Sequence, residues 1–173
     1  MMRARNAWLF GLLGMSLAGG RTAAQVTGQD KAKADSSFAA LQERGKTAMG
    51  VDQYTSTHKF DALADGGRIE LQRNMHDPAG VAQIREHLRA ITAAFQSGDF
   101  TIPAFVHMQE VPGTGVMAAK RSQITYTFTP LPRGGAVRIR TKDHEALKAI
   151  HQFIAFQRHD HHAGGMDHDA MHH

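Results

Sequence analysis

The side chains best suited to chemistry gather in the last fifteen residues. Segment 159–173 reads HDHHAGGMDHDAMHH and holds six of the chain's twelve histidines, with two methionines and three aspartates. Imidazole nitrogen suits Cu(II), zinc and nickel, and thioether sulfur suits Cu(I). The interleaved aspartate, methionine and glycine differ from the plain histidine run of a purification handle. The alternative is a solvated, low-complexity tail with incidental metal affinity. The predicted ligands in this segment are His159, His161, His162, Met166, His168, Met171, His172 and His173.

A second set of nitrogen and sulfur ligands lies in FVHMQEVPGTGVM, which contains His107, Met108 and Met117. Methionine usually fills gaps in a core, and we expect that of Met108. His107 and Met117, with His58, are the candidate ligands in the folded part of the chain. Over about a dozen residues the stretch resembles the His-Met motif of cupredoxin-like periplasmic copper chaperones. The gap from Met108 to Met117 is shorter than in that motif, and no His-x-Met follows.

The N-terminus has the order of a secretory signal. Arg3 and Arg5 precede an apolar run over residues 7–18, which is too short to span a bilayer as a mature helix. Small residues at 22–24 suit signal peptidase, with Gln25 as the new N-terminus. We therefore expect a signal peptide at residues 1–24 and a periplasmic or secreted protein. An N-terminal membrane anchor is the alternative.

Charge and cysteine content exclude several classes of function. Loss of the three arginines of the leader would lower the formal charge from +4 to +1. No basic excess would then remain to pair with nucleic-acid phosphates. The chain has no cysteine, which excludes disulfides, thiolate metal sites and a lipoprotein anchor. Histidine and methionine are the remaining soft or borderline ligands for a transition metal.

An internal repeat organises the chain. Residues 55–71 (TSTHKFDALADGGRIEL) align without a gap on residues 123–139 (QITYTFTPLPRGGAVRI). In both copies apolar residues alternate on either side of Gly-Gly, which is the pattern of a β-hairpin. We expect strands near 54–62, 67–73, 122–129 and 136–141.

Each hairpin is followed by a predicted helix. Asp77 and Pro78 are suited to begin one, and an apolar stripe at helical spacing extends it over 78–96. Asp143 begins the second, over 143–158. Another helix is expected over 36–48, after a flexible segment at 25–35.

The pattern predicts a single α+β domain over 36–158. Two ββα units, 54–96 and 122–158, would form one four-stranded antiparallel sheet with both helices on one face and a pseudo-twofold between the halves. The connection over 97–121 is long for a compact domain. Within it, TIPAFVHM has the character of a short strand, and GVMAAKRS that of a short helix.

Four of the remaining histidines lie on predicted regular elements. His58 is in phase with Phe60 on a strand, which is typical of a histidine packed on a sheet face. His87, His144 and His151 lie on helices, and the sequence leaves open whether they converge on one site.

Catalysis has little support in the sequence, and we predict no catalytic residue. Ser56, His58 and Asp61 are a nucleophile, a base and an acid, but strand alternation places Asp61 on the other face. No G-x-S-x-G, H-E-x-x-H or glycine-rich phosphate loop occurs. A hydrolase without a familiar motif is the second alternative.

Several stretches resemble a family of small exported bacterial proteins of unassigned function with a His-rich C-terminus. They are MGVDQYTSTHKF, GGRIELQR, PGTGVMAAKR, ITYTF, PLPRGG and FQRHDHH. The resemblance extends over the whole chain after the leader and implies an exported α+β domain. Some members carry a carbamoyltransferase label. YTSTHKF resembles the Ser-Thr-Arg-Thr loop of those enzymes, but His58 and Lys59 stand in place of Arg-Thr, so these residues do not support the label.

The sequence thus predicts an exported metal-binding protein that handles or buffers copper, with zinc or nickel as other candidate ions. The expected partners are the metal ion and another periplasmic protein, with no nucleic acid and no membrane after cleavage. The first alternative is a non-catalytic interaction or ligand-binding module whose His-rich tail is incidental.

Overall fold

The structure, a computed structural model, describes residues 23–165, with side chains from residue 30 onward. The helices are α1 (Ala23–Met49), η1 (Gln53–Thr55), α2 (Pro78–Ser97), α3 (Thr101–His107), α4 (Thr114–Ala119), η2 (Arg121–Gln123) and α5 (His144–Asp160). The strands are β1 (Ser56–Leu63), β2 (Gly66–Arg73), β3 (Ile124–Leu131) and β4 (Gly134–Thr141). Within residues 23–165, no helix is both long enough and apolar enough to cross a membrane.

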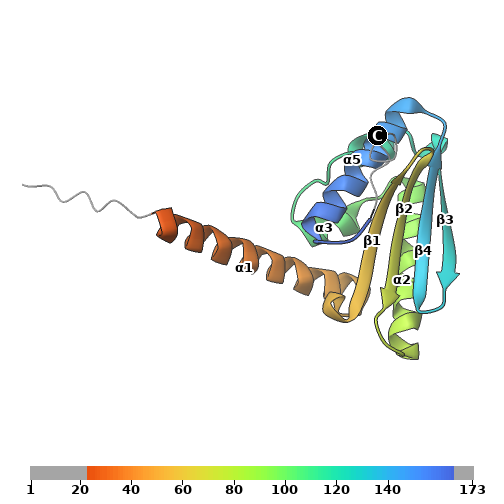
Figure 1. Ribbon diagram of the computed structural model, residues 1–173. Helices are drawn as coiled ribbons and strands as arrows, with labels where there is room; N and C mark the ends of the chain where they lie inside the picture. Colours follow the sequence, from red (N-terminus) through yellow and green to blue (C-terminus); the bar gives the residue numbers. More distant parts are fainter. Residues whose placement is uncertain (1–22, 166–173) are drawn as a thin grey trace, which may run out of the picture.

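The four strands form one antiparallel sheet in the order β1-β2-β4-β3 (Figure 1). Each hairpin turns through the two residues before a Gly-Gly, Ala64-Asp65 and Pro132-Arg133, so that Leu63 lies opposite Gly66 and Leu131 opposite Gly134. The second strands of the two hairpins pair at the centre, where Leu71 lies opposite Gly135. The predicted α+β fold with a single four-stranded sheet is confirmed, and the strand order is symmetric about its centre.

Both long helices of the repeat cover the same face of the sheet. A Cβ added at Gly67 would lie 2.9 Å from Ile154 Cγ1 on α5, and one added at Gly135 would lie 3.0 Å from Leu88 Cδ1 on α2. Gly67 and Leu71 point to one face because side chains alternate along a strand, and Leu71 is paired with Gly135. The helix caps are also those expected: Asp77 accepts from Gly80 N at 3.0 Å and Asp143 from Ala146 N at 2.8 Å.

Two segments differ from the expectation. Helix α1 begins at Ala23 and continues through residues 25–35, so the predicted flexible segment is wrong, and this half of the helix projects away from the sheet (Figure 1). TIPAFVHM forms α3 rather than a strand. Its buried residues are Pro103, Val106 and His107, which share one face at helical spacing, and Pro103 is tolerated because it lies in the first turn.

The C-terminal tail begins later than expected. Helix α5 extends to Asp160, and residues 161–165 turn back along β1, where Phe60 N donates to Gly164 O at 2.9 Å. The predicted boundary at 158/159 is therefore wrong, because residues 159–165 belong to the folded domain. Residues 166–173 and the predicted signal sequence up to residue 22 lie outside the described residues.

Candidate functional site

Three buried histidines from three different elements meet beside the first half of β1. His58 comes from β1, His107 from the end of α3 and His161 from the end of α5, and each is only 7–8% exposed. The rings of His58 and His161 are stacked, with centroids 5.5 Å apart and 10° between their planes. The ring of His107 stands edge-on to His161, with centroids 5.0 Å apart. We call these three residues the histidine cluster.

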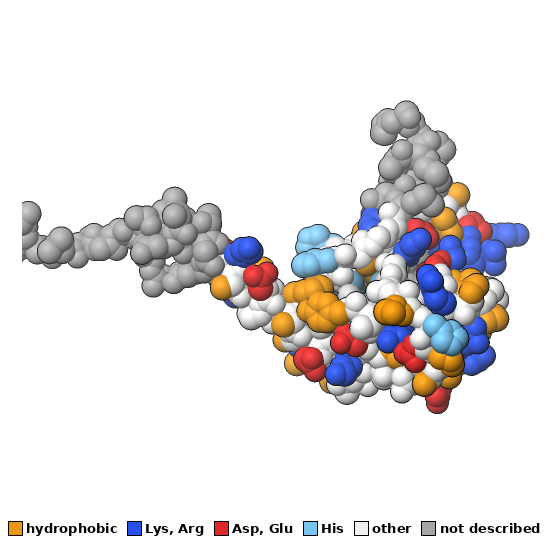
Figure 2. Space-filling view, turned by 60° about the horizontal axis from the view of Figure 1, so that its bottom comes forward, with side chains coloured by type: hydrophobic (Ala, Val, Ile, Leu, Met, Phe, Trp, Pro, Cys, Tyr) orange, Lys and Arg blue, Asp and Glu red, His pale blue; other side chains and the backbone are white. Residues whose placement is uncertain are grey.

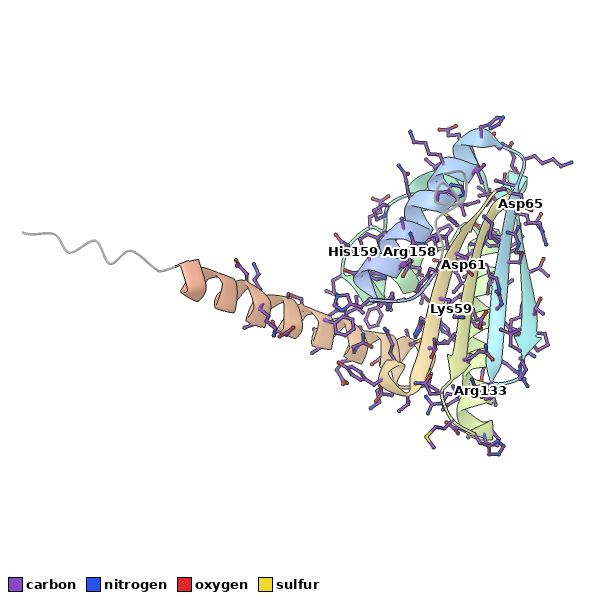
Figure 3. All side chains as sticks on the ribbon, viewed as in Figure 1. Lys59, Asp61, Asp65, Arg133, Arg158 and His159 are labelled. Atoms are coloured by element: carbon purple, nitrogen blue, oxygen red, sulfur yellow. The ribbon has the colours of Figure 1, made fainter. Side chains whose placement is uncertain are left out.

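Local structure explains how each ring reaches the cluster. His58 and Phe60 share the helix-covered face of β1, and His107 follows Pro103 by one helical turn on the buried side of α3. After α5, His162 adopts the left-handed conformation (φ 49°), which turns the chain back along β1 and keeps His161 inside. Figure 3 shows this end of α5, marked by Arg158 and His159, beside β1.

Side-chain amides and a carboxylate hold two of the rings. His107 Nδ1 donates to Asp160 Oδ2 at 2.5 Å, and its Nε2 meets the Gln157 side-chain amide at 2.9 Å. His161 Nδ1 lies 2.9 Å from Gln53 Oε1, and Gln53 Nε2 donates to the His161 carbonyl at 3.2 Å. The Asp160 carboxylate and Gln157 Oε1 both accept, so each of the two His107 ring nitrogens faces an oxygen acceptor.

Burial keeps two of these imidazoles, those of His58 and His161, neutral. Loss of hydration lowers the pKa of His58 to about 4, helped by the neighbouring His87. It also lowers the pKa of His161 to about 2, helped by His58, His107 and His162. Burial lowers the pKa of His87 as well, opposed by its hydrogen bond to the Ala48 carbonyl. A neutral imidazole is the form that coordinates a metal ion or accepts a proton.

The histidine cluster borders a small, mostly apolar cavity of about 80 Å³. Apolar side chains of α1, α2, α3 and the sheet form most of its wall, and Gln157, His87 and the cluster supply its polar lining. His58 Nδ1 is buried and has no hydrogen-bond partner among the described residues. An unpaired buried nitrogen is costly, so its position suggests a partner that the protein itself does not provide.

None of the other predicted site residues that the structure describes joins the cluster. Met117 is fully buried in the core and does not line the cavity, so His107 and Met117 are not brought together. Exposed His162 stacks on Phe38, with ring centroids 4.2 Å apart, and His159 is exposed in the last turn of α5. Met166, His168, Met171, His172 and His173 lie outside the described residues.

Of the three helix histidines left open by the sequence, His87 lines the cavity. His151 instead pairs through Nε2 with the Leu63 carbonyl at 2.9 Å, and His144 is exposed at the start of α5. The structure thus adds one histidine to the surroundings of the cluster and places two elsewhere.

The structure contains no Ser-His-Asp triad at β1. Ser56 Oγ donates to the Asp52 carbonyl at 3.0 Å rather than to His58. Asp61 lies 4.0 Å from Arg68, and strand alternation places it on the opposite face of the sheet from His58. The expected position of Asp61 on the other face is confirmed.

Sequence reasoning missed the polar partners Gln53, Gln157 and Asp160. Gln157 could have been recognised from the sequence, because it continues the inward stripe of Ile150 and Ile154 at helical spacing and a polar residue on such a stripe needs a hydrogen-bond partner. Gln53 and Asp160 could not have been recognised, because their contacts depend on how segments distant in the sequence pack together.

The cluster is not a ready-made metal site. Among the described side chains, no three of the His, Asp and Glu residues are arranged to hold an ion together. The Gln157 amide lies on His107 Nε2, the ring nitrogen that a metal would need because Asp160 holds Nδ1. Comparisons with protein-family models, with curated proteins and with solved structures give no match to this chain.

Proposed function

We propose that this is an exported protein that binds a late transition-metal ion, copper above others, at the histidine cluster. The observation that carries the proposal is the meeting of three buried imidazoles, two of which have a pKa of about 4 or lower. A neutral imidazole needs no deprotonation before it coordinates, so such a site would keep its affinity in mildly acidic surroundings.

Metal binding at the cluster requires side chains, rather than the backbone, to move. His58 Nδ1 is already without a partner among the described residues. Gln53 Oε1 can stay on His161 Nδ1 while Nε2 of that ring coordinates, whereas Gln157 must release His107 Nε2. Asp160 would remain on His107 Nδ1 and orient the ring, as a carboxylate does for many metal-bound histidines. The described arrangement is thus suited to be the metal-free state.

The His/Met-rich tail supplies further candidate ligands, and it follows directly after a segment that packs beside the cluster. Gly164 is hydrogen bonded to Phe60, two residues from His58 along β1, and the tail continues from Gly165. Its methionines offer the thioether sulfur that Cu(I) prefers, and its histidines suit Cu(II). We propose that the tail captures the ion and that the cluster holds it. Met117 has no part in this because it lies in the core.

The test is a titration of the untagged protein with Cu(I), Cu(II) and Zn(II), with metal content measured on protein isolated from its own source. A chain ending at Gly165 should retain one tight copper equivalent, and a His58→Phe/His107→Phe double variant of that chain should lose it. His144→Phe, which removes an exposed histidine outside the cluster, is the matched control. Circular dichroism checks that each variant is folded. If the chain ending at Gly165 binds no copper above background, the domain is not a metal site.

A further inference from the structure

A groove lies on the other side of the His58–His161 pair from the cavity. Its volume is about 360 Å³, within the range of small-molecule sites, and it runs between α1, η1 and the C-terminal turn. Six of the side chains that line it are Phe38, Gln42, Tyr54, His58, His161 and His162. Figure 2 shows histidine side chains next to hydrophobic ones where α1 meets the rest of the domain.

Gln42 is the unusual member of this groove. It is only 4% exposed, and neither its amide oxygen nor its amide nitrogen has a hydrogen-bond partner among the described residues. It occupies the buried side of α1, next to Leu41 and one turn after Phe38, where an apolar residue would pack without this cost. His58 Nδ1 is also unpartnered. Two side chains that line one groove therefore leave three buried polar atoms unsatisfied.

The charge of the groove restricts what could satisfy them. None of the described residues that line it is Asp, Glu, Lys or Arg. A charged ligand would therefore lose its hydration without gaining a counter-charge, which is strongly unfavourable. A neutral ligand with its own donor and acceptor avoids this penalty.

We propose that the groove binds a small uncharged molecule that carries a primary carboxamide, carbamoyl or ureido group on an apolar body. The Gln42 amide offers one donor and one acceptor side by side, so a second amide pairs with it reciprocally. The apolar body lies against Phe38 and Tyr54, whose rings are 6.5 Å apart in an edge-on arrangement. The groove shares His58 and His161 with the proposed metal site, but Gln42, the residue that would pair with the ligand's amide, lies outside the histidine cluster.

Benzamide is the probe, titrated into ¹⁵N-labelled protein and followed by nuclear magnetic resonance, including the Gln42 side-chain amide signals. The comparison ligands have a size similar to that of benzamide. Benzoate and benzylamine carry a charge, and ethylbenzene is uncharged but lacks the amide. Gln42→Leu has nearly the same shape without the polar atoms, and it should fold at least as stably because it removes an unsatisfied buried amide. Gln152→Leu, an exposed glutamine on α5, is the matched control.

We expect saturable shifts with benzamide, and affinity weakened at least about tenfold both by Gln42→Leu and by exchange of benzamide for benzoate. Gln152→Leu should bind benzamide as the wild type does. Equal affinity for benzamide and benzoate, or unchanged affinity in Gln42→Leu, would overturn the proposal. So would the absence of saturable shifts up to about 50 mM benzamide, since water would then be the partner of Gln42. Copper stoichiometry of Gln42→Leu, measured in parallel, should be that of the wild type, which separates failure of this site from failure of the metal site.

Discussion

Mild acid should destabilise the domain through His58. The pKa of this histidine falls from 6.5 to about 4 on burial, so the unfolded chain takes up a proton at a pH where the folded protein does not. The free energy of unfolding therefore has its full value, as far as His58 is concerned, above pH 6.5, and it decreases as the pH falls from 6.5 toward 4. Between pH 7.5 and pH 5, proton binding to the unfolded state alone lowers the free energy of unfolding by about 2 kcal/mol.

His161 acts in the same direction. Its pKa in the folded protein is about 2, so it too stays neutral at pH 5 and contributes about a further 2 kcal/mol. The two contributions add at this pH because neither ring is charged in the folded state. Their mutual repulsion matters only once the pH approaches the lower pKa values.

The assay is urea unfolding at pH 7.5 and pH 5 in the presence of a chelator, followed by circular dichroism. The loss of stability between the two pH values should be about 2 kcal/mol smaller in His58→Phe than in the wild type. Phenylalanine keeps an aromatic ring next to Phe60 and His161, and His144→Phe is the control for the loss of a histidine as such. An equal loss of unfolding free energy in wild type and His58→Phe would refute the argument, because the burial of His58 would then not be coupled to proton uptake.

Three further changes have expected outcomes in the same unfolding assay. Tyr126→Phe should stabilise the protein by about 1 kcal/mol, because burial raises the pKa of its hydroxyl and that oxygen has no partner among the described residues. A loss of stability would mean that the hydroxyl does have a hydrogen-bond partner. Gly67→Ala should cost about 1–3 kcal/mol, because its Cβ would lie 2.9 Å from Ile154 Cγ1; an unchanged midpoint would mean that α5 shifts freely. Truncation after Gly165 should leave the melting temperature nearly unchanged, whereas truncation after Asp160 should lower it by several degrees, since it removes the buried His161. Equal melting temperatures for the two truncated chains would contradict the packing of residues 161–165 on β1.

The sheet and its two helices were predictable because each has a strong local signal. Alternation around Gly-Gly specifies a hairpin, and Asp77 with Pro78 specifies a helix start. The Gly-Gly pairs were interpreted as part of a hairpin pattern, but in the structure Gly67 and Gly135 also leave room for the helices. Neither has positive φ, and α5 and α2 pack directly against them.

Helix α3 was mistaken for a strand because seven residues are too few to show a helical period. The individual ligand types at His58, His107 and His161 were recognised from chemistry alone. Their convergence was not predictable, because they come from β1, α3 and α5 and meet only through tertiary packing. Gln42 was missed for a similar reason, since the burial of a single glutamine on a helix can be recognised only once its surroundings are known.

The return of residues 161–165 along β1 also protects the sheet from other chains. Strand β1 is an outer strand, and Gly164 accepts the hydrogen bond that Phe60 N would otherwise offer to a foreign strand. At the opposite edge, the Gln96 side chain pairs with Ile124 O at 3.1 Å, and Pro130 has no amide proton to donate.

Residues 161–165 therefore have two effects that arise from the same packing against β1. It places His161 over His58, and it occupies the backbone groups through which sheets polymerise. A protease that cut between Asp160 and Gly164 would open the histidine cluster and, in the same event, create a template for aggregation. Selection for solubility would then preserve the geometry of the site even where no ligand was present to select for it.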